Sequence, residues 1–254
     1  MAANKKTPSY DLNAQNRKRD LFVKLGLTTL VIAFAVGLVL YIVMGSEKKA
    51  GAGDVQAVRI ASAEVIKKKD SDEPKAVISI YEDFQCPHCA DFEKKFGPTL
   101  AKIAKSGAAA VDYNMLAILN KISGGYSERA ANAAYCVADE NKEAFERFHS
   151  ALFVQQPEEG SGSGPDNDRL IETARQAGVV GSVPDCIRNN KYGDMVKGLA
   201  AASKVTSTPT IRLNGEDISV ATPEELIAKV TQVVGPVPAL APTPAPAPAP
   251  APAS

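Results

Sequence analysis

Hydrophobic and polar residues follow strand and helix spacings through the middle of the chain. Residues 76–81 (AVISIY) form a short β-branched run that ends in polar residues, which predicts a buried strand. From Cys89 onward, apolar residues recur at steps of three and four, the spacing of one helix face, and Pro98 predicts a kink in that helix. A second strand is predicted over residues 109–119. A helix that links two strands favours a parallel pair.

The following stretch predicts several helices and a terminal hairpin. The predicted elements are helices over 127–153 and 168–177, a helix from 182, hairpin strands over 211–213 and 218–220, and a last helix from 222. Ser182 and Asp185 have the spacing of a capping box, in which side chains satisfy free N–H groups of the first turn. Asn214 and Gly215 tolerate the positive φ that a tight hairpin turn requires.

These elements, in this order, predict one compact α/β domain. The domain takes residues 55–235 and contains a helical insertion at about 120–205. A composition of 45% hydrophobic and 23% charged residues is typical of a folded protein. The 29 basic side chains balance 29 acidic ones, so the chain lacks the basic field that nucleic-acid binding normally requires.

An uncharged apolar segment precedes the domain. Residues 25–44 carry no charged side chain, and at ~1.5 Å per residue a helix of this length covers a ~30 Å hydrocarbon layer. Buried core helices rarely stay uncharged for so long, and a cleaved signal peptide has a shorter apolar stretch. The basic tail, residues 1–24, is expected to stay in the cytoplasm. We therefore predict one transmembrane anchor, with everything from the linker 45–54 onward outside the cytoplasm.

The chain ends in an Ala/Pro-rich stretch, residues 236–254. Proline fixes φ and favours an extended left-handed helix, so this composition does not build a core. The sequence predicts a disordered tail, which is either simply solvated or acts as a spacer or partner ligand.

Four cysteines carry the most specific chemical signal. Cys86-Pro87-His88-Cys89 lies between the first predicted strand and the helix that follows. Free N–H groups and the positive dipole at a helix start stabilise a thiolate, and an intervening His adds a donor, so Cys86 is expected to titrate well below a free thiol. Cys89 lies one turn further, on the face that carries Phe92, and is expected to be buried. One accessible thiolate with one sheltered partner is the arrangement required for thiol–disulfide exchange.

Other uses of this motif fit less well. Haem attachment needs C-x-x-C-H, but residue 90 is Ala. A zinc site needs further ligands at matched spacing, whereas the chain offers only Cys136, His149 and Cys186, so no metal is predicted. His149, in the stretch FERFH, is interpreted as an ordinary packed or exposed histidine. Because most X-Pro peptide bonds in folded proteins are trans, the residues alone predict a trans bond between Thr208 and Pro209.

The stretches EDFQCPHC, FGP and TSTPT together resemble the DsbA family of thiol:disulfide oxidoreductases, in its membrane-anchored actinobacterial form with two cysteine pairs. The resemblance covers about residues 55–235. It implies a thioredoxin fold with an inserted helical domain, preceded by one transmembrane helix. It also implies that Cys86 is the nucleophile, that Cys89 is the resolving thiol, and that Thr208-Pro209 is a cis loop which contacts the dithiol and the substrate.

The chain departs from this family pattern at two positions. Many members carry a buried acid six residues before the first cysteine, where this chain has Ile80, so Glu82 and Asp83 become the candidates for a proton relay to Cys89. Ser207 stands where the family usually has Gly before T-P-T, which predicts a stiffer or shifted substrate loop.

Cys136 and Cys186 are expected to form a second, structural disulfide within the helical block, with two buried free thiols as the alternative. The predicted function is oxidation of reduced exported proteins by the Cys86–Cys89 disulfide, with no cofactor. The resemblance implies a quinone-linked membrane reoxidant of the DsbB or VKOR type. An isomerase or reductase of the same fold, a chaperone-like module and a metal-delivery protein are the alternatives.

Overall fold

A computed structural model describes residues 57–162, 164–179 and 181–241, together with Phe34. The chain divides into two units, Met1–Lys48 and Lys49–Ser254, and the fold below is that of the second. No helix within the described ranges is long and apolar enough to cross a membrane. Apart from Phe34, the predicted anchor at residues 25–44 lies outside the described residues, as do the basic tail and the linker.

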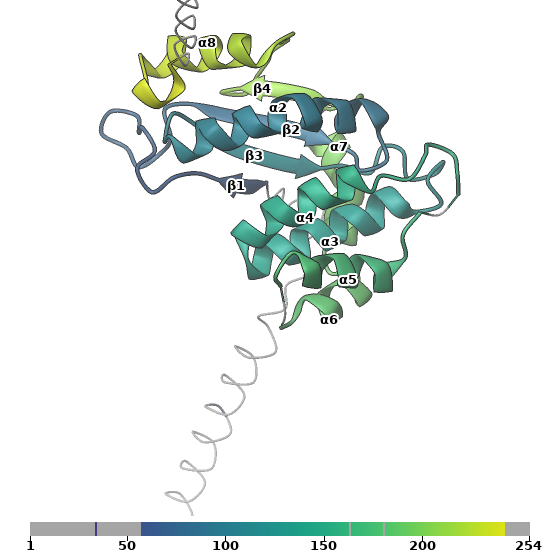
Figure 1. Ribbon diagram of the computed structural model, residues 1–254. Helices are drawn as coiled ribbons and strands as arrows, with labels where there is room; N and C mark the ends of the chain where they lie inside the picture. Colours follow the sequence, from purple (N-terminus) through teal and green to yellow (C-terminus); the bar gives the residue numbers. More distant parts are fainter. Residues whose placement is uncertain (1–33, 35–56, 163, 180, 242–254) are drawn as a thin grey trace, which may run out of the picture. The chain divides into compact units, whose positions relative to one another are not determined.

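A five-stranded mixed sheet forms the centre of the domain (Figure 1). Its strands are β1 (Val58–Ile60), β2 (Val77–Glu82), β3 (Ala110–Met115), β4 (Thr210–Leu213) and β5 (Glu216–Asp217), and their spatial order is β1-β3-β2-β4-β5. The central pair, β2 and β3, is parallel as predicted, and all other neighbours are antiparallel. The parallel register places the carboxyl end of β2 beside that of β3.

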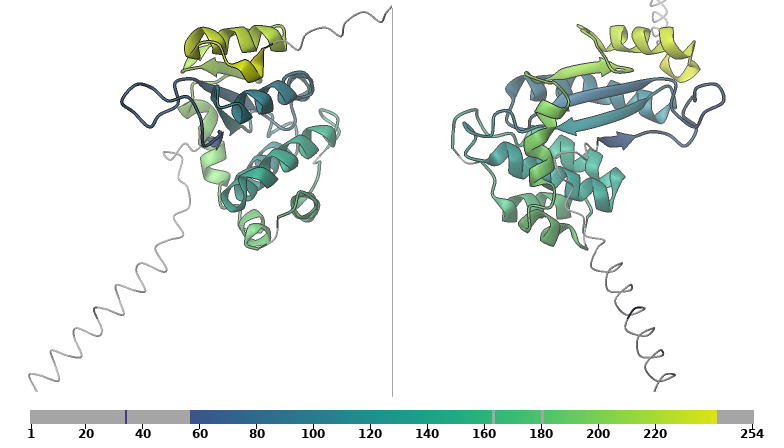
Figure 2. Two further views of the ribbon diagram at one scale, coloured as in Figure 1. Left: turned by 60° about the vertical axis from the view of Figure 1, so that its left-hand side comes forward. Right: turned by 180° about the vertical axis from the view of Figure 1, so that it is seen from behind.

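The described residues also form seven α-helices. They are α2 (Pro87–Lys105), α3 (Tyr126–Glu140), α4 (Lys142–Val154), α5 (Asn167–Gln176), α6 (Val183–Arg188), α7 (Gly193–Ala202) and α8 (Pro223–Val234). Helix α2 lies on one face of the sheet and contacts α8, whereas α7 runs across the other face (Figures 1 and 2). Helices α3 to α6 pack against one another, and α4 also contacts α2.

The core forms where the apolar face of α2 meets the sheet. The side chains at the predicted helical steps, Cys89, Phe92, Phe96, Leu100 and Ile103, are all buried. They pack in one cluster with Ile78 and Ile80 of β2, which are fully buried. Each such large side chain contributes ~1.5–3 kcal/mol through removal from water. This packing fixes the start of α2, and with it Cys86, against the end of β2.

Several predicted boundaries were wrong. The helix predicted over 127–153 is divided between α3 and α4 at Asn141, whose extended backbone ends α3 and whose side chain accepts the Ala144 N–H. The returning hairpin strand is β5, two residues earlier than predicted, and β1 and α7 were not predicted at all. Strand β1 is only three residues long and α7 is rich in Ala and Gly, so neither has a strong hydrophobic period.

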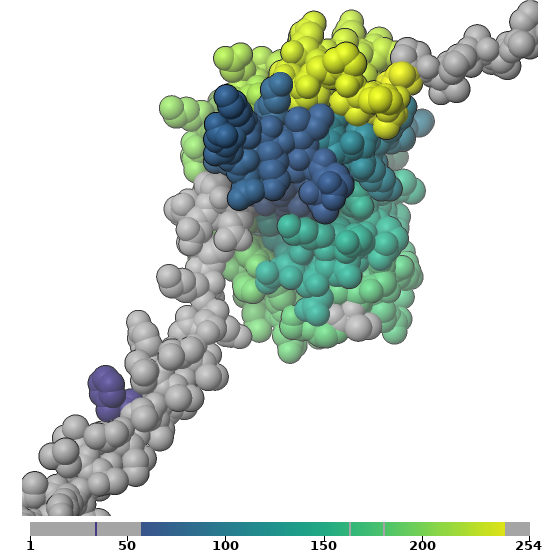
Figure 3. All heavy atoms as spheres, turned by 90° about the vertical axis from the view of Figure 1, so that its left-hand side faces the viewer, coloured from purple at the N-terminus to yellow at the C-terminus, as the bar shows by residue number. Residues whose placement is uncertain are grey.

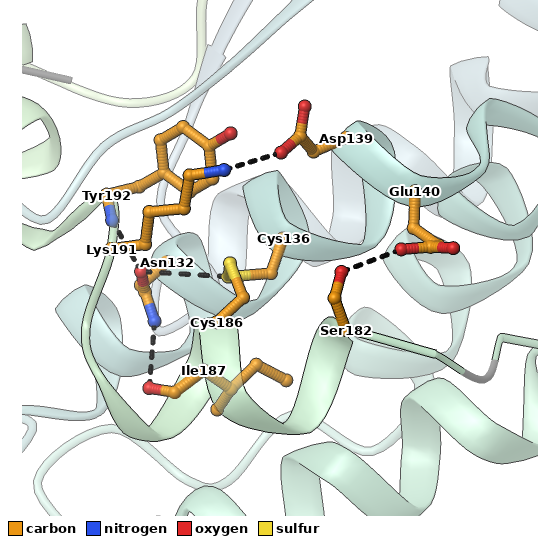
Figure 4. Close-up of a disulfide and its surroundings, with 9 residues drawn as sticks. All are labelled: Asn132, Cys136, Asp139, Glu140, Ser182, Cys186, Ile187, Lys191 and Tyr192. Atoms are coloured by element: carbon orange, nitrogen blue, oxygen red, sulfur yellow. Dashed lines mark hydrogen bonds and ion pairs between the residues drawn. A yellow bond between two sulfur atoms is a disulfide. The ribbon is translucent and has the colours of Figure 1, made fainter. Parts of the chain in front are cut away.

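The predicted capping box before α6 does not form. Ser182 is the N-cap residue of α6 but its side chain caps no N–H group; instead its hydroxyl donates to Glu140 Oε2 at 2.8 Å (Figure 4). The backbone of Ser182 is already helical, whereas a capping side chain needs an extended one.

The C-terminal end of the fold extends into the segment predicted as a disordered tail. Pro238–Leu240 forms a short 3-10 helix, and Leu240 is only 3% exposed. Residues 242–254 lie outside the described ranges. In the space-filling view of Figure 3, α8 in yellow lies beside the dark-blue segment that joins β1 to β2.

Candidate active site

The two cysteines of the CPHC motif lie at the start of α2. Cys86 is the N-cap residue, with extended backbone, and Pro87 opens the helix. Both cysteines are free thiols in this structure. Cys89 is fully buried, as predicted, but Cys86 is also only 5% exposed, so it is less accessible than expected. The helix start explains the geometry, since Cys89 N–H donates to the carbonyl of Cys86 at 3.0 Å and closes the first turn.

Hydrogen bonds lower the pKa of the Cys86 thiol to about 6. The hydrogen bond from the Cys89 side chain lowers this pKa most. Burial opposes it and raises the pKa. The Thr208 side chain and the backbone N–H groups of Cys89 and His88 lower the pKa further. As a thiol, Cys86 donates to the Thr208 carbonyl at 3.4 Å; as a thiolate it accepts instead from the Thr208 hydroxyl. The side chain of His88 is exposed, and its backbone N–H acts on the sulfur.

Cys89 has the opposite tendency. Burial raises the pKa of the Cys89 thiol far above its ordinary value, and the hydrogen bond it gives to Cys86 and the nearby charge of Glu82 raise it further. The backbone N–H of Asp83 donates to the Cys89 sulfur and only partly offsets these effects. One sulfur is therefore a stable anion near neutral pH and the other a stable thiol, which is the division of roles that thiol–disulfide exchange needs.

Thr208 and Pro209 face this dithiol from the loop before β4. The peptide bond between them is cis. The family resemblance implied a cis bond, whereas the general frequency of cis X-Pro bonds predicted a trans one. Ser207, the departure from the family pattern, accepts a hydrogen bond from the Thr210 hydroxyl at 2.7 Å through its backbone carbonyl. The loop therefore places Thr208, with its carbonyl and hydroxyl, against Cys86.

The two acids suggested for proton transfer have different surroundings. Asp83 is fully buried, and its carboxylate accepts the N–H groups of Gln85 at 2.9 Å and Leu119 at 2.8 Å, so it holds two loops together. Glu82 ends β2 and is 2% exposed, rather than lying in a solvated loop. Burial raises the pKa of Glu82 to about 8, so its proton is exchangeable near neutral pH.

Sequence reasoning missed the two residues that Glu82 contacts. His149 of α4, interpreted as an ordinary histidine, is 3% exposed, and its Nε2 lies 2.8 Å from Glu82 Oε2. Its Nδ1 lies 3.8 Å from Oε2 of Glu93, a residue of α2. Glu93 follows Cys89 by four residues, or one helical turn, so it lies on the same apolar helix face. An acidic residue on that face is the feature from which the sequence could have predicted the role of Glu93.

Glu82, Glu93 and His149 offer ligand atoms within 4.8 Å of one another, which is close enough to hold a metal ion. The two carboxylates, however, face different nitrogens of one imidazole ring. A single ion can take only one of those nitrogens, so the arrangement favours proton sharing over metal binding.

The other cysteine pair lies in the helical insertion. Cys136 of α3 and Cys186 of α6 form a disulfide, with Sγ–Sγ 2.02 Å and Cα–Cα 5.8 Å (Figure 4). Asn132, one turn before Cys136, donates to the Ile187 carbonyl at 3.3 Å and accepts the Tyr192 N–H at 2.9 Å. These bonds and the disulfide tie α6 and the start of α7 to α3.

A mixed sheet of this topology, with a dithiol at the start of the helix after β2 and a cis-proline loop beside it, defines a thioredoxin-fold thiol–disulfide oxidoreductase. A family model described as Thioredoxin matches residues 71–231. A crystal structure of DsbA from Mycobacterium tuberculosis in the reduced state is 52% identical and covers 73% of this chain and 95% of its own, with a TM-score of 0.71. The chain belongs to the Thioredoxin family and, within it, to the DsbA-type enzymes, so it is a protein disulfide oxidoreductase.

More distant proteins match parts of the chain. MdbA, a thiol-disulfide oxidoreductase from Corynebacterium diphtheriae, is 26% identical over 69% of this chain and 89% of its own, with a TM-score of 0.57. Among curated proteins, the serine/threonine-protein kinase PknE of Mycobacterium tuberculosis is 31% identical over 117 residues, which is 44% of this chain. The match spans only 21% of the kinase.

Proposed function

We propose that this enzyme acts as an oxidase that introduces disulfides into exported proteins. A substrate thiolate attacks Cys86 Sγ, the Cys86–Cys89 bond breaks, and Cys89 leaves with the electron pair and takes up a proton. A second substrate thiolate then attacks the substrate sulfur of the mixed disulfide, and Cys86 leaves as a thiolate. The substrate loses two electrons and the enzyme gains them, so each cycle ends with the reduced enzyme.

The stabilised Cys86 thiolate is the observation that supports this direction. With a pKa of about 6, against 9.0 for an ordinary thiol, Cys86 is ~90% ionised at pH 7. The gain for the reduced state is ~1.4 kcal/mol, or ~30 mV of oxidising power for a two-electron couple. The sulfur lies near the protein surface, where solvent screens part of this energy, so the figure is an upper value.

The proposed location and partners follow from the segments in front of the domain. A basic tail and an apolar span, residues 25–44, support a single anchor with the dithiol outside the cytoplasm. Reduced proteins that emerge there would be the substrates. An oxidase must also be reoxidised, and we propose a quinone-linked membrane protein of the DsbB or VKOR type as the acceptor of its two electrons.

The direction of reaction is tested with purified oxidised enzyme and a reduced, unfolded substrate protein. We expect one substrate disulfide to form for each enzyme disulfide consumed, and no reaction with Cys86→Ser. The chain has no Trp, so alkylation followed by mass measurement is the readout. Faster reshuffling of a scrambled, fully oxidised substrate than oxidation of a reduced one would identify an isomerase instead.

The location is tested separately with a phosphatase that is active only after export. Fused after Ser46, it should be active in cells. Activity confined to a cytoplasmic reporter at the same position would contradict an extracytoplasmic dithiol.

A further inference from the structure

Every cycle of the proposed reaction moves a proton on and off Cys89. The sulfur takes up a proton when the disulfide is cleaved and releases it on reoxidation. Cys89 is fully buried in the structure, and Cys86 beside it is only 5% exposed. The proton therefore needs a route through the protein, and this inference rests on the proposed dithiol chemistry.

The inner side of Cys89 faces the end of β2. The N–H of Asp83 donates to the Cys89 sulfur, and the preceding residue, Glu82, interacts electrostatically with both thiols. Glu82 Oε1 and Glu93 Oε1 are both buried without a hydrogen-bond partner among the described residues. The two side chains also hydrogen-bond each other, which two carboxyl groups can do only when at least one of them carries a proton.

His149 bridges these two carboxyls. The relay uses the tautomer in which Nε2–H donates to Glu82 Oε2 at 2.8 Å while a neutral Glu82 keeps its own proton on Oε1. The unprotonated Nδ1 of the neutral ring then faces Glu93 Oε2 at 3.8 Å. Burial lowers the pKa of His149, so the ring is neutral at neutral pH. Four aromatic rings hold the imidazole in this position, with centroids 4.8–5.5 Å away: Phe84, Tyr113, Phe145 and Phe153.

The far end of this bridge reaches a groove. A cavity of about 590 Å³ lies between α2 and α4, and Glu93 and His149 line it. The side chain of Glu93 is 11% exposed, whereas that of Glu82 is 2% exposed. Exposure therefore rises from Glu82 toward the groove, and Glu93 is the member of the set that meets solvent.

We propose that protons travel between Cys89 and solvent through Glu82, His149 and Glu93, by way of the groove between α2 and α4. When substrate cleaves the disulfide, Cys89 takes the Glu82 proton. Glu82 regains one from His149 Nε2 while Nδ1 takes one from Glu93, which is refilled from the groove. Reoxidation runs the route in reverse, and no group changes its net proton count over a cycle. His149 acts through Glu82, so it is a positioning and relay residue.

Charged neighbours tune the relay from each element packed around it. The charges of Glu93 on α2 and Glu146 on α4 oppose the effect of burial on the pKa of His149. Tyr113 on β3 stays neutral, because burial raises the pKa of its phenol well above the ordinary value. Glu82, with its pKa of about 8, is the group whose ionisation should appear in the pH dependence of the rate.

The test uses thiol exchange between the full-length enzyme and glutathione, which does not depend on the direction of the biological reaction. His149→Gln and Glu93→Gln remove the relay but keep a hydrogen-bonding side chain. Asp91→Asn is the matched control, because Asp91 lines the same groove on α2 and is exposed. The readouts are the exchange rate against pH, the rate ratio between H2O and D2O, and the equilibrium constant with glutathione.

We expect both relay variants to slow exchange at least ~10-fold, to increase the rate ratio between H2O and D2O and to alter the pH profile of the rate. The equilibrium constant with glutathione should stay within ~2-fold of that of the unsubstituted enzyme. Asp91→Asn should match the unsubstituted enzyme. An unchanged rate and isotope ratio in His149→Gln would overturn the role of His149, because direct transfer between the two carboxyls would then carry the proton. Equal losses in Asp91→Asn would also overturn it.

Chemical rescue separates relay from packing. In His149→Gly, added imidazole should restore exchange, whereas 1-methylimidazole, with one nitrogen blocked, should not. Equal rescue by both would show that the ring only fills space. Should His149→Gly fail to fold, the two Gln variants still decide the matter. An enzyme that exchanges with glutathione through this relay but does not oxidise proteins would contradict the proposed function and leave the relay intact.

Discussion

Removal of the Thr208 hydroxyl should make Cys86 less acidic. Thr208→Val keeps the branched shape but deletes the donor that the Cys86 thiolate accepts. A hydrogen bond to a charged group contributes ~1.5–3 kcal/mol, and solvent screening near the surface favours the lower end. About 1.4 kcal/mol corresponds to one pKa unit, so the midpoint should rise from about 6 to ~7. At pH 7 the ionised fraction would fall from ~0.9 to ~0.5.

This change should weaken the oxidant. The reduced state loses ~1 kcal/mol at pH 7, equivalent to ~20 mV. The pKa of Cys86 is lowered in the folded enzyme, so the stabilisation of its thiolate is fully present at pH values above 9.0, the ordinary pKa of the thiol. This stabilisation is lost as the pH falls through about 6. In Thr208→Val the loss should begin at the same pH but be complete ~1 pH unit higher.

The assay is the alkylation rate of the reduced enzyme against pH, since the thiolate is the reactive form and buried Cys89 does not compete. Thr210→Val is the control, because the Thr210 hydroxyl donates to the Ser207 carbonyl and not to the sulfur. A midpoint that stays near 6 in Thr208→Val, or that moves equally in Thr210→Val, would refute the hydroxyl's role.

Three further outcomes are expected. Replacing Cys136 and Cys186 together by Ala should lower the free energy of unfolding by up to ~4 kcal/mol, because the crosslink joins residues 50 apart and restricts the unfolded chain. A free energy from urea unfolding that differs by less than ~1 kcal/mol would contradict this expectation. Gln156→Ala removes two donors to carbonyls at the active-site turn, so it should destabilise the fold by ~1–3 kcal/mol in the same assay without moving the Cys86 alkylation midpoint. His88→Ala should leave that midpoint unchanged because the backbone N–H acts on the sulfur; a rise would show that the imidazole contributes.

The parts of the fold that sequence could predict were those with strong local signals. The β-branched run before Cys86 and the helical steps from Cys89 onward are local patterns, and both elements formed where expected. The division at Asn141 was missed because an Ala-rich stretch continues the helical pattern across it. Ser182 was wrongly predicted to cap α6, because its actual hydrogen-bond partner, Glu140, lies 42 residues away in sequence.

The same distinction applies to the site. The dithiol could be located from spacing, because a helix start and its N–H groups are local features. The group around Glu82 could not, since it combines the end of β2, one turn of α2 and a helix of the insertion. His149 is 67 residues from Glu82 in sequence, and no local pattern distinguishes it from a packed histidine.

The most direct measurement of the division of roles between the two thiols is the trapping of reaction intermediates in cells. We propose that Cys86 forms the mixed disulfide with substrates and that Cys89 releases stalled ones. Cys89→Ala should therefore accumulate mixed disulfides with exported cysteine proteins, whereas Cys86→Ala should accumulate none. The asymmetry follows from Cys86 being the stable thiolate at the start of α2 and Cys89 being fully buried. The variants are compared on non-reducing gels after acid quenching, and reductant-released partners are identified by mass. Trapping by Cys89→Ala alone is the predicted result; equal trapping by both variants, or by neither, would contradict the assigned roles.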